Sequence, residues 1–581
     1  MKLIDYYAQE IRYFLDEAHR FAGRYPDQAK ALNLEEVRER DPYVERLIEA
    51  FAFLSGNIQK RLDDDFSNLA QELIETLWPH YLSPLPGALI FQFTPVLGRL
   101  KKATVVSPGA QADSHTVSTG LPCRFTTTSE VIVRPLEIRQ ASMVGRRDGR
   151  SALRICLAPM KGASWSDMGT EPVRIYLHGD TGFAFSLYYI LLQDTEDVVV
   201  RYGTDDEQNE IAVGARSVSA VGLDSEKDAP LLSYPMPSFP GFRLLEEYFF
   251  FPEKYRFVDL DFLSALDGGD PQGAVEVDFV LTGRNDWRLL PDASAFRLHC
   301  TPGVNRYAKS AEPIHVEDAL PYNKIIVDQA HPYHHVPLEV TRVEGIRLEQ
   351  SLRHSYTPFL SYEHEMDGRE KSGYYHIRRQ VSVDDVPELL LGIHRPMDSG
   401  PEIVSLDLIC SNGRSVREVK AGDVRHPGEN LPDSVSVSNL TTPKAPAWPS
   451  LEGRELWTLV HHLSLNYLSL DDPERFRALL AFYDREKTLA NQRRVAGLTA
   501  VKIVPAEILF KGFPLRGVDM EITLDEGHFT GQGDLLMFAH VLSRVMAMYV
   551  PINSFCNLCV RELNSENVYT WPGIKGCQAI V

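Results

Sequence analysis

A dense aromatic run near the middle of the chain, GFRLLEEYFFFPEKYRFVDLDF at 241–262, constrains the fold more than any other segment. Burying one such aromatic side chain contributes roughly 1.5–3 kcal/mol, so the run must lie in a core or against a partner. Pro240 suits a first helical turn, and Pro252 cannot continue a helix. The sequence therefore predicts a helix from Pro240 to about Phe251, followed by an extended segment through Asp261.

The aromatic run is interpreted as a core between domains, because buried aromatic side chains usually belong to cores. A partner-docking surface is the alternative that the sequence leaves open. The adjacent Glu246 and Glu247 point about 100° apart on a helix, so they do not converge as an acid/base pair. The candidate core residues are Phe242, Leu245, Tyr248, Phe249, Phe251 and Tyr255.

Residues 1–83 are predicted to be helical. The first helix carries an apolar seam with steps of three and four residues, which suits contact with another helix. Asp41 and Pro42 mark the start of a second helix, and the aspartates at 63–65 are expected to interrupt it. The candidate partner-interface residues are Ile4, Tyr7, Ile11 and Phe14. The alternative is that this seam packs against the chain's own helices in 42–83.

The sequence after residue 83 predicts an α+β multidomain protein with β-rich, sandwich-like middle modules, because short β-rich runs are broken by Gly, Pro and Ser. In the last part, Asp472-Pro473 and Asp534 are expected to start helices, and FCNLCVREL with VYTWPG, at 555–563 and 568–573, to form a closing hairpin. The expected domains are a helical region at 1–83, a β-rich domain at 84–235, the aromatic-run helix with a second β-rich region at 236–349, a third β-rich module at 350–450 ending in a proline-rich linker from 426, and an α+β domain at 451–581.

The net charge of −20 disfavours binding to nucleic acid or to an anionic membrane surface. No run of about 18 apolar residues exists, so no membrane-spanning helix is expected. The seven cysteines are odd in number and scattered, which does not suit a disulfide framework. A reducing cytoplasm is therefore the expected compartment.

No motif in the chain carries recognisable catalytic chemistry. GxSxG, GxxxxGK[ST], HExxH and a usable GxGxxG are missing, which is weak evidence against an enzyme and, together with the size and the aromatic seams of the chain, favours a scaffold. Cys556 and Cys559 form a single CxxC in an expected strand, where residues three apart face opposite sides and suit neither a metal nor a disulfide. The histidines of HPYHH at 331–335 are interpreted as a surface loop rather than a metal site.

Several long stretches resemble one known family in order and at compatible spacing. They are MKLIDYYAQEIRYFLDEAHR, LIETLWPHYLSPLPGALIFQF, the aromatic run itself, FRLHCTPGVNRYAKSAEPI, WTLVHHLSLNYLSL and RGVDMEITLDEGHFTGQGDLLMFAHVLSRVMAMYVPINSF. These segments are similar to the TssF family, also called VasA or ImpG, of type VI secretion baseplates. The resemblance covers nearly the whole chain.

The resemblance implies a structural, non-enzymatic baseplate protein without a cofactor, in the cytoplasm and docked near the inner membrane. In that family two TssF copies join one TssG in a wedge that also carries TssK and TssE, and six wedges surround the VgrG hub and support sheath contraction. Two other classes remain: a baseplate wedge protein of a contractile prophage tail, and a β-sandwich hydrolase. A hydrolase would require a polar cleft with convergent carboxylates of perturbed pKa.

Overall fold

The computed structural model describes most of the chain. The described residues are 3–25, 42–77, 79–204, 207–223, 230–232, 240–266, 271, 273–282, 290–316, 321–347, 352–359, 373–382, 386–395, 401–449, 451, 471–510, 513–548, 550 and 554–575. The sequence also predicts a helix over LEGRELWTLVHHLSLNYLSL at 451–470, which lies outside them except for Leu451.

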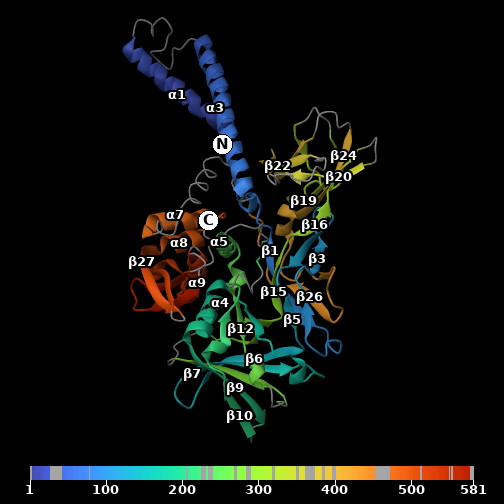
Figure 1. Cartoon of the computed structure of the whole chain (residues 1–581), viewed down its shortest axis with the longest axis vertical. Coiled ribbons are helices and arrows are strands. Elements are labelled where there is room, and N and C mark those ends of the chain that lie inside the picture. Colours follow the sequence, from blue (N-terminus) through green and yellow to red (C-terminus); the bar gives the residue numbers. More distant parts are fainter. Residues whose placement is uncertain are drawn as a thin grey trace. The chain divides into compact units, whose positions relative to one another are not determined.

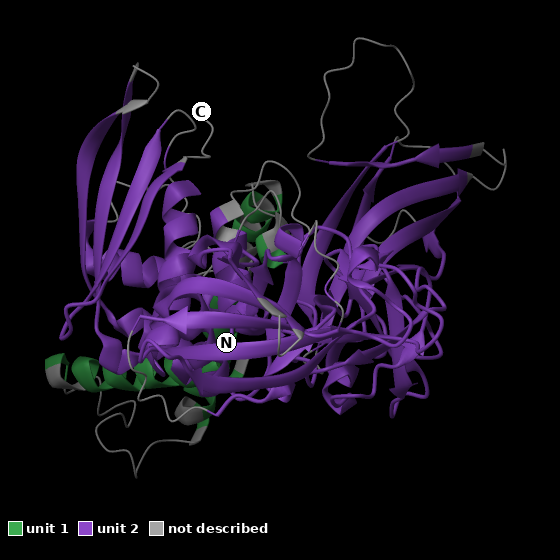
Figure 2. Ribbon diagram, turned by 90° about the horizontal axis from the view of Figure 1, so that it is seen from below, with its two compact units in different colours: residues 1–82, 450–464 green, residues 83–449, 465–581 purple. Residues whose placement is uncertain are grey.

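The chain divides into two compact units (Figure 2). The first contains Met1–Leu82 and Ser450–Ser464, and the second contains Ser83–Pro449 and Leu465–Val581. The fold class is as predicted: a helical N-terminal region, many β-sheets in the middle and an α+β region at the end of the chain.

Two long helices dominate the first unit, α1 (Leu3–Arg24) and α3 (Pro42–Leu77), which lie against each other (Figure 1). Pro42 opens α3 as expected, since a first-turn proline lacks only an N–H that would have no helical partner; Asp41 lies outside the described residues. The expected interruption at 63–65 is wrong, because α3 runs through it without a break. Aspartate in a helix interior costs only a few tenths of a kcal/mol, which tertiary packing overrides.

A six-stranded antiparallel sheet joins segments that are far apart in the sequence. Its order is β25 (His426–Pro427), β3 (Gln111–Thr116), β4 (Pro122–Thr127), β15 (Cys300–Val304), β1 (Ala88–Pro95) and β26 (Val435–Asn439). The expected linker at 426–450 therefore supplies two strands, and further bridges join Leu85 to Ala447 and Ala88 to Lys444. Its proline content suits edge positions of a sheet, where a missing N–H breaks no ladder.

Two smaller antiparallel sheets follow in the second unit. The first runs β10 (Glu207–Ala212), β9 (Thr195–Thr204), β13 (Val275–Leu281), β7 (Ser151–Pro159) and β6 (Leu136–Gly145); the second runs β11 (Val218–Ala220), β12 (Phe257–Leu260), β8 (Val173–Leu177) and β14 (Phe296–Leu298). Both draw strands from either side of the predicted boundary at 235. The sequence boundary therefore does not separate two sheets.

A further pair of sheets shares one apolar core, which includes Val404, Leu406 and Leu408 from one sheet and Leu391 from the other. The first contains β16 (Tyr307–Ser310), β24 (Glu402–Ser411), β19 (Val336–Arg347) and β20 (Leu352–Ser355), with β17 (Ile314–Val316) also paired to β24. The second runs β18 (Asn323–Lys324), β23 (Pro387–His394), β22 (Tyr374–Val381) and β21 (Thr357–Pro358). In β24 these buried side chains alternate with exposed Ser405 and Asp407, as expected for a strand with one face on a core.

The last part is α+β, as expected. Its elements are α7 (Pro473–Tyr483), α8 (Leu489–Ala496), β27 (Leu498–Phe510), β28 (Phe513–Leu524), α9 (Gln532–Met548), β29 (Phe555–Glu562) and β30 (Val568–Lys575). The Asp472 side chain accepts from the Glu474 N–H and caps α7 as predicted. β28 and β29 pair in parallel across the α9 crossover, and β29 and β30 form the expected closing hairpin.

The aromatic run forms helix α5 (Pro240–Phe250), then a 3₁₀ turn at Pro252–Tyr255, then β12. Phe250 and Phe251 join a core with Ala88 and Ile90 of β1 and with Tyr176 of β8. The ring of Tyr248 lies 5.9 Å from that of Phe538 in α9. α5 thus packs between the β-sheets and the C-terminal helices.

The candidate core residues of the run have very low exposure. The exposed fractions are 0% for Leu245, Tyr248 and Tyr255 and 2% for Phe249 and Phe251. The side chain of Phe242 lies outside the described residues.

Phe249→Ala is expected to lower the free energy of unfolding by about 3–5 kcal/mol, because it deletes a fully buried ring and leaves a cavity. Urea unfolding followed by circular dichroism measures the change. Leu97→Ala is the control, since Leu97 is 74% exposed and its truncation is expected to stay within about 0.5 kcal/mol. A Phe249→Ala protein as stable as the control would show that the ring does not contribute to this core.

Candidate functional site

The predicted interface seam on α1 lies partly against α3. The ring of Tyr7 packs edge-on against that of Phe53, with their centroids 6.4 Å apart. Ser55 Oγ donates a hydrogen bond to Glu10 Oε2 at 2.7 Å. Ile4 is 64% exposed, whereas Ile11 and Phe14 are half-buried. The seam therefore divides between contact within the hairpin and exposure to solvent.

Gly56 in α3 permits the close approach of the two helices. A Cβ at this position would lie only 3.1 Å from the backbone nitrogen of Tyr7. A larger residue would therefore force the helices apart. The same contact turns the opposite face of α3 away from α1.

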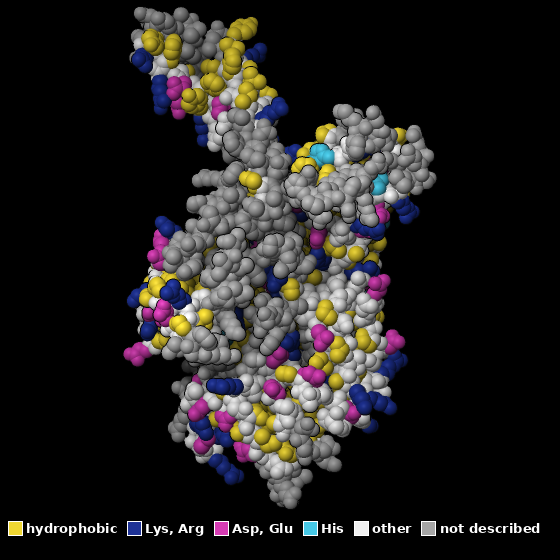
Figure 3. Space-filling view, in the orientation of Figure 1, with side chains coloured by type: hydrophobic (Ala, Val, Ile, Leu, Met, Phe, Trp, Pro, Cys, Tyr) yellow, Lys and Arg dark blue, Asp and Glu magenta, His cyan; other side chains and the backbone are white. Residues whose placement is uncertain are grey.

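That opposite face carries an apolar row, here called the α3 stripe, with exposed fractions between 54% and 57%: Leu47, Phe51, Leu54 and Ile58. The steps of four, three and four residues keep these side chains on one face of a helix. Hydrophobic side chains gather over the described parts of α1 and α3 in Figure 3. The spacing of these residues in the sequence indicates one apolar face but does not distinguish an internal core from an external contact.

The carboxylates on α5 are buried and separately paired. Glu246 forms an ion pair with Arg485, and the side chains of both residues are 3% exposed. Glu247 pairs with Lys254 and also accepts from the backbone N–H of Leu231 at 2.9 Å. The two carboxylates bind different cations, which agrees with the expectation that they do not converge.

A second buried ion pair lies beside α5. Arg494 Nε donates to Asp534 Oδ1 at 2.8 Å, and the Arg494 guanidinium lies over the ring of Tyr248, 5.7 Å from its centroid. Asn491 Nδ2 donates to the Phe249 carbonyl at 3.0 Å. Asp534 was expected to cap α9, but the helix begins two residues earlier at Gln532, so Asp534 lies in the first turn and anchors Arg494.

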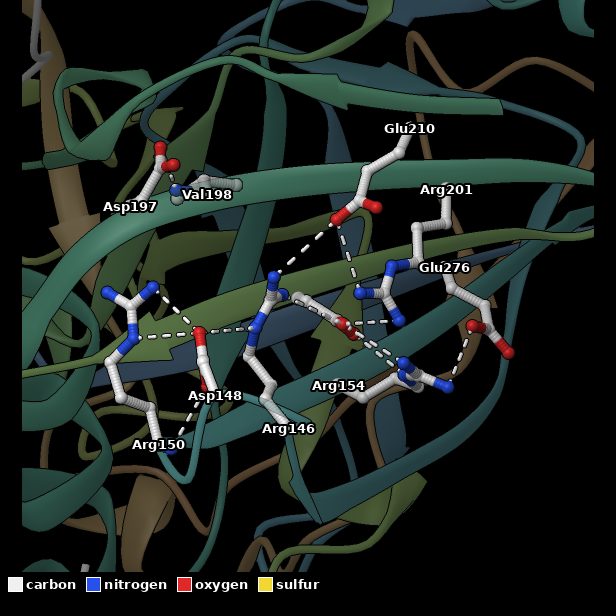
Figure 4. A network of polar contacts seen from close by, with 10 residues as sticks. Arg146, Asp148, Arg150, Arg154, Asp197, Val198, Arg201, Glu210 and Glu276 are labelled. Atoms are coloured by element: carbon white, nitrogen blue, oxygen red, sulfur yellow. Dashed lines mark hydrogen bonds and ion pairs between the residues drawn. The ribbon is translucent and has the colours of Figure 1, made fainter. Parts of the chain in front are cut away.

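A charged ladder covers one face of the β10–β9–β13–β7–β6 sheet. Asp278 is fully buried, and its Oδ1 accepts a hydrogen bond from Arg154 Nε at 2.7 Å. Its Oδ2 lies 3.3 Å from Arg201 Nη1 and 3.7 Å from Arg146 Nη1. These three arginines point toward one another in Figure 4, and Arg154 also pairs with Glu276 at 2.8 Å. Each guanidinium has a carboxylate beside it, so the ladder is a structural network rather than an anion site.

The interpretation of 331–335 as a surface loop is wrong for its second and third histidines, His334 and His335. His334 is only 1% exposed. Its Nδ1 lies 2.6 Å from Thr119 Oγ1, in the loop between β3 and β4, and its Nε2 lies 2.9 Å from Asn412 Nδ2, at the end of β24. His334 therefore links the six-stranded sheet to the neighbouring sandwich.

His335 adds further polar contacts beside those of His334. Its Nδ1 lies 2.7 Å from the Tyr307 hydroxyl and its Nε2 lies 2.8 Å from Lys309 Nζ. Asp328, which the sequence reasoning overlooked, lies 3.3 Å from His331 Nδ1 and 3.8 Å from His335 Nε2. Lys309 Nζ also lies 3.6 Å from Asp328 Oδ2, so a cationic side chain already pairs with the carboxylate and the imidazole. Burial, with Lys309 as a secondary cause, lowers the pKa of His335 to about 4.

The CxxC faces are as expected for a strand. Cys556 is buried and Cys559 is half-buried on the other face of β29, and both are free thiols. Burial raises the pKa of Cys556 to about 12, which keeps the thiol protonated. Within the described ranges, no group of three or more His, Cys, Asp and Glu residues is arranged to hold a metal. None of the described helices combines the length and apolar character that a bilayer crossing requires.

Arg485→Met is expected to lower the free energy of unfolding by about 3–5 kcal/mol, because Glu246 would remain buried without its cation. Adding Glu246→Gln is expected to recover part of the loss. The matched control is Arg516→Met, since the Arg516–Glu507 pair is 88% and 65% exposed and is expected to contribute at most about 1 kcal/mol. Equal urea midpoints for Arg485→Met and the control would contradict the role of the buried pair.

Acid is expected to destabilise the module that contains His335. The pKa in the folded chain lies below the ordinary value of about 6.5, so the unfolded chain binds the proton more readily. The contribution of His335 to the free energy of unfolding is fully present above about pH 6.5 and falls as the pH drops toward 4. At pH 5 the free energy of unfolding is expected to be lower by about 2 kcal/mol.

Urea unfolding of wild type and His335→Gln at pH 7.5 and pH 5 measures this effect. The loss between the two pH values is expected to be smaller by that amount in His335→Gln. His315→Gln is the control, because His315 is exposed in the same module. An equal acid loss in all three proteins would contradict the assignment.

Comparisons with known proteins place the whole chain in one family. The family model "Type VI secretion system, TssF" matches residues 1–578. The type VI secretion system component TssF1 of Pseudomonas aeruginosa is 28% identical over an alignment of 631 residues, covering 99% of each chain. A chain of the TssK-TssF-TssG baseplate subcomplex, solved by cryo-electron microscopy, has a TM-score of 0.76 at 28% identity, covering 92% of this chain and 99% of that chain. A chain of the baseplate complex from the type VI secretion system, 24% identical with a TM-score of 0.63 and 100% coverage of both chains, shares the fold. The chain belongs to the TssF family of type VI secretion systems.

Proposed function

We propose that the chain is a non-enzymatic structural subunit of the type VI secretion baseplate. Two copies would join one TssG in a wedge that supports sheath assembly and contraction-driven effector delivery. Family membership over the full length supports this role, as does the TssK-TssF-TssG subcomplex that contains a similar chain. The family match also favours a secretion apparatus over a prophage tail.

The observation that carries the proposal is the α3 stripe. Four large apolar side chains in register on one face, each more than half exposed, are unusual on a surface without a partner. Their spacing fits another helix laid along α3. α1 covers only one face of α3 and leaves the α3 stripe exposed. Helices from other chains are therefore expected to pack on the stripe and complete a bundle.

The seam residues Ile4, Tyr7, Ile11 and Phe14 belong to the same proposed interface. Tyr7 would hold the hairpin together through Phe53, and Ile4 would extend the apolar surface toward the partner. Ile11 and Phe14 are half-buried and would serve both contacts. TssG and a second copy of this chain are the proposed occupants.

The other proposed contacts follow from the family alone. TssK, TssE and the VgrG hub would bind in the assembled baseplate, which lies in the cytoplasm near the inner membrane. The net charge of −20 opposes direct binding to nucleic acid or anionic lipid. The buried ion pairs at α5 and the buried hydrogen bonds of His334 suit a scaffold that transmits force between modules. This role requires no cofactor.

Co-expression with TssG, followed by native mass measurement, tests the function. The expected result is a stable complex with two copies of this chain and one TssG. A stable monomer that does not bind TssG would overturn the proposal.

Substitutions on the hairpin test the interface. Phe51→Asp with Leu54→Asp is expected to abolish co-purification with TssG, because two charges would be buried in the bundle. Ile11→Asp with Phe14→Asp is expected to weaken it at least tenfold. Gln9→Asp is the control, since Gln9 is exposed on α1 and is expected to leave the complex unchanged.

Circular dichroism separates an interface effect from unfolding of the hairpin. Both double variants are expected to keep the wild-type helical signal. If the folded variants still bind TssG like wild type, the interface lies elsewhere. If only Ile11→Asp with Phe14→Asp loses helix, the seam is an internal contact of the hairpin, and the α3 variant alone decides the proposal.

A further inference from the structure

Two histidines meet on the outer face of the β18–β23–β22–β21 sheet. His376 lies on β22 and His394 on β23, which pair in antiparallel register. The Nδ1 atom of His376 lies 3.0 Å from the Nε2 atom of His394, and the ring centroids are 4.8 Å apart. His394 is exposed and His376 is half-buried, so both rings meet at a surface that solvent reaches.

The position of His376 depends on a glycine in the neighbouring strand. Gly392 is the register partner of His376, and a Cβ at 392 would lie 2.1 Å from His376 Cε1. The imidazole therefore lies across the strand in the space that a side chain would fill. The ring of Tyr322 contacts His376 at 5.1 Å and that of Phe359 contacts His394 at 5.5 Å, so both imidazoles are held in place by aromatic neighbours.

We propose that His376 Nδ1 and His394 Nε2 form a bidentate site for a divalent copper or nickel ion. Imidazole nitrogens bind such ions at about 2.0–2.1 Å, so two ligands in adjacent positions of a square-planar ion lie about 2.9 Å apart, close to the observed separation. A tetrahedral zinc ion would need about 3.3 Å, which fits less well. Water would fill the remaining positions.

The proton between the two rings also has to be accounted for. Burial, with the neighbouring His394 as a secondary cause, lowers the pKa of His376. In the ion-free pair one facing nitrogen carries the shared proton. On metal binding that ring moves its proton to its other nitrogen through solvent, and two neutral imidazoles then bind the ion without net proton release.

Titration of the untagged full-length chain with Cu²⁺ tests the site, after treatment with a chelator and its removal. Calorimetry is expected to find one tight site per chain, and electron paramagnetic resonance of the copper-loaded chain is expected to show coupling to two nitrogen ligands. His394→Gln is expected to weaken binding at least tenfold and to remove one nitrogen coupling. Ni²⁺ is expected to bind the same site, and Zn²⁺ more weakly than either.

Two further variants keep the test independent of folding. His426→Gln removes an exposed histidine on β25 and is expected to bind Cu²⁺ like wild type. Gly392→Ala keeps both histidines but displaces the ring of His376, and it is expected to weaken Cu²⁺ binding with the fold retained by circular dichroism. Wild-type copper affinity and two-nitrogen coupling in His394→Gln would overturn the proposal, and so would a wild-type chain without the tight site.

Discussion

Glu246 and Glu247 lie side by side on α5, yet each is buried against a different cation, Arg485 and Lys254. A buried carboxylate without a partner would cost several kcal/mol, so the aromatic helix can enter the core only when both cations are in place. Arg485 precedes α8 in the C-terminal part, and Lys254 belongs to the turn after α5 itself. The apolar core between the sheets and the C-terminal helices therefore depends on one correctly assembled set of charges, which selects a single packing of these elements.

Local signals predicted the elements of this region well. Proline placement at 240 and 252 bounded α5, the Asp472 cap located α7, and β-rich runs broken by Gly, Pro and Ser indicated the β-rich middle of the chain. What the sequence did not reveal were non-local partners. The proline-rich composition of 426–450 suits a linker as well as edge strands, and only its pairing with β1 decides between them. Asp534 resembled a helix cap because its ion-pair partner, Arg494, is 40 residues away.

The same limit applies to the candidate sites. Spacing identified apolar faces on both N-terminal helices, but it did not assign them to an internal or external contact; the close approach at Gly56 and the exposure of Leu47 and Ile58 supply that distinction. His334 looked like a loop residue because its partners, Thr119 and Asn412, are 215 and 78 residues distant. The sequence pattern does not predict the pairing of His376 and His394, since neither belongs to a motif and only strand register brings them together.

The order of strands in the six-stranded sheet has a consequence for synthesis of the chain. The Ile90 N–H donates to Thr441 Oγ1, 351 residues later, so β1 leaves the ribosome long before its second neighbour exists. Such long-range pairing is slow and leaves strand edges open in the meantime. The contact between α1 and α3 joins residues of the first 77 positions, which are synthesised first. A nascent chain would thus complete its N-terminal helices before its β-sheets close, so that the proposed interface is available to partner subunits during translation.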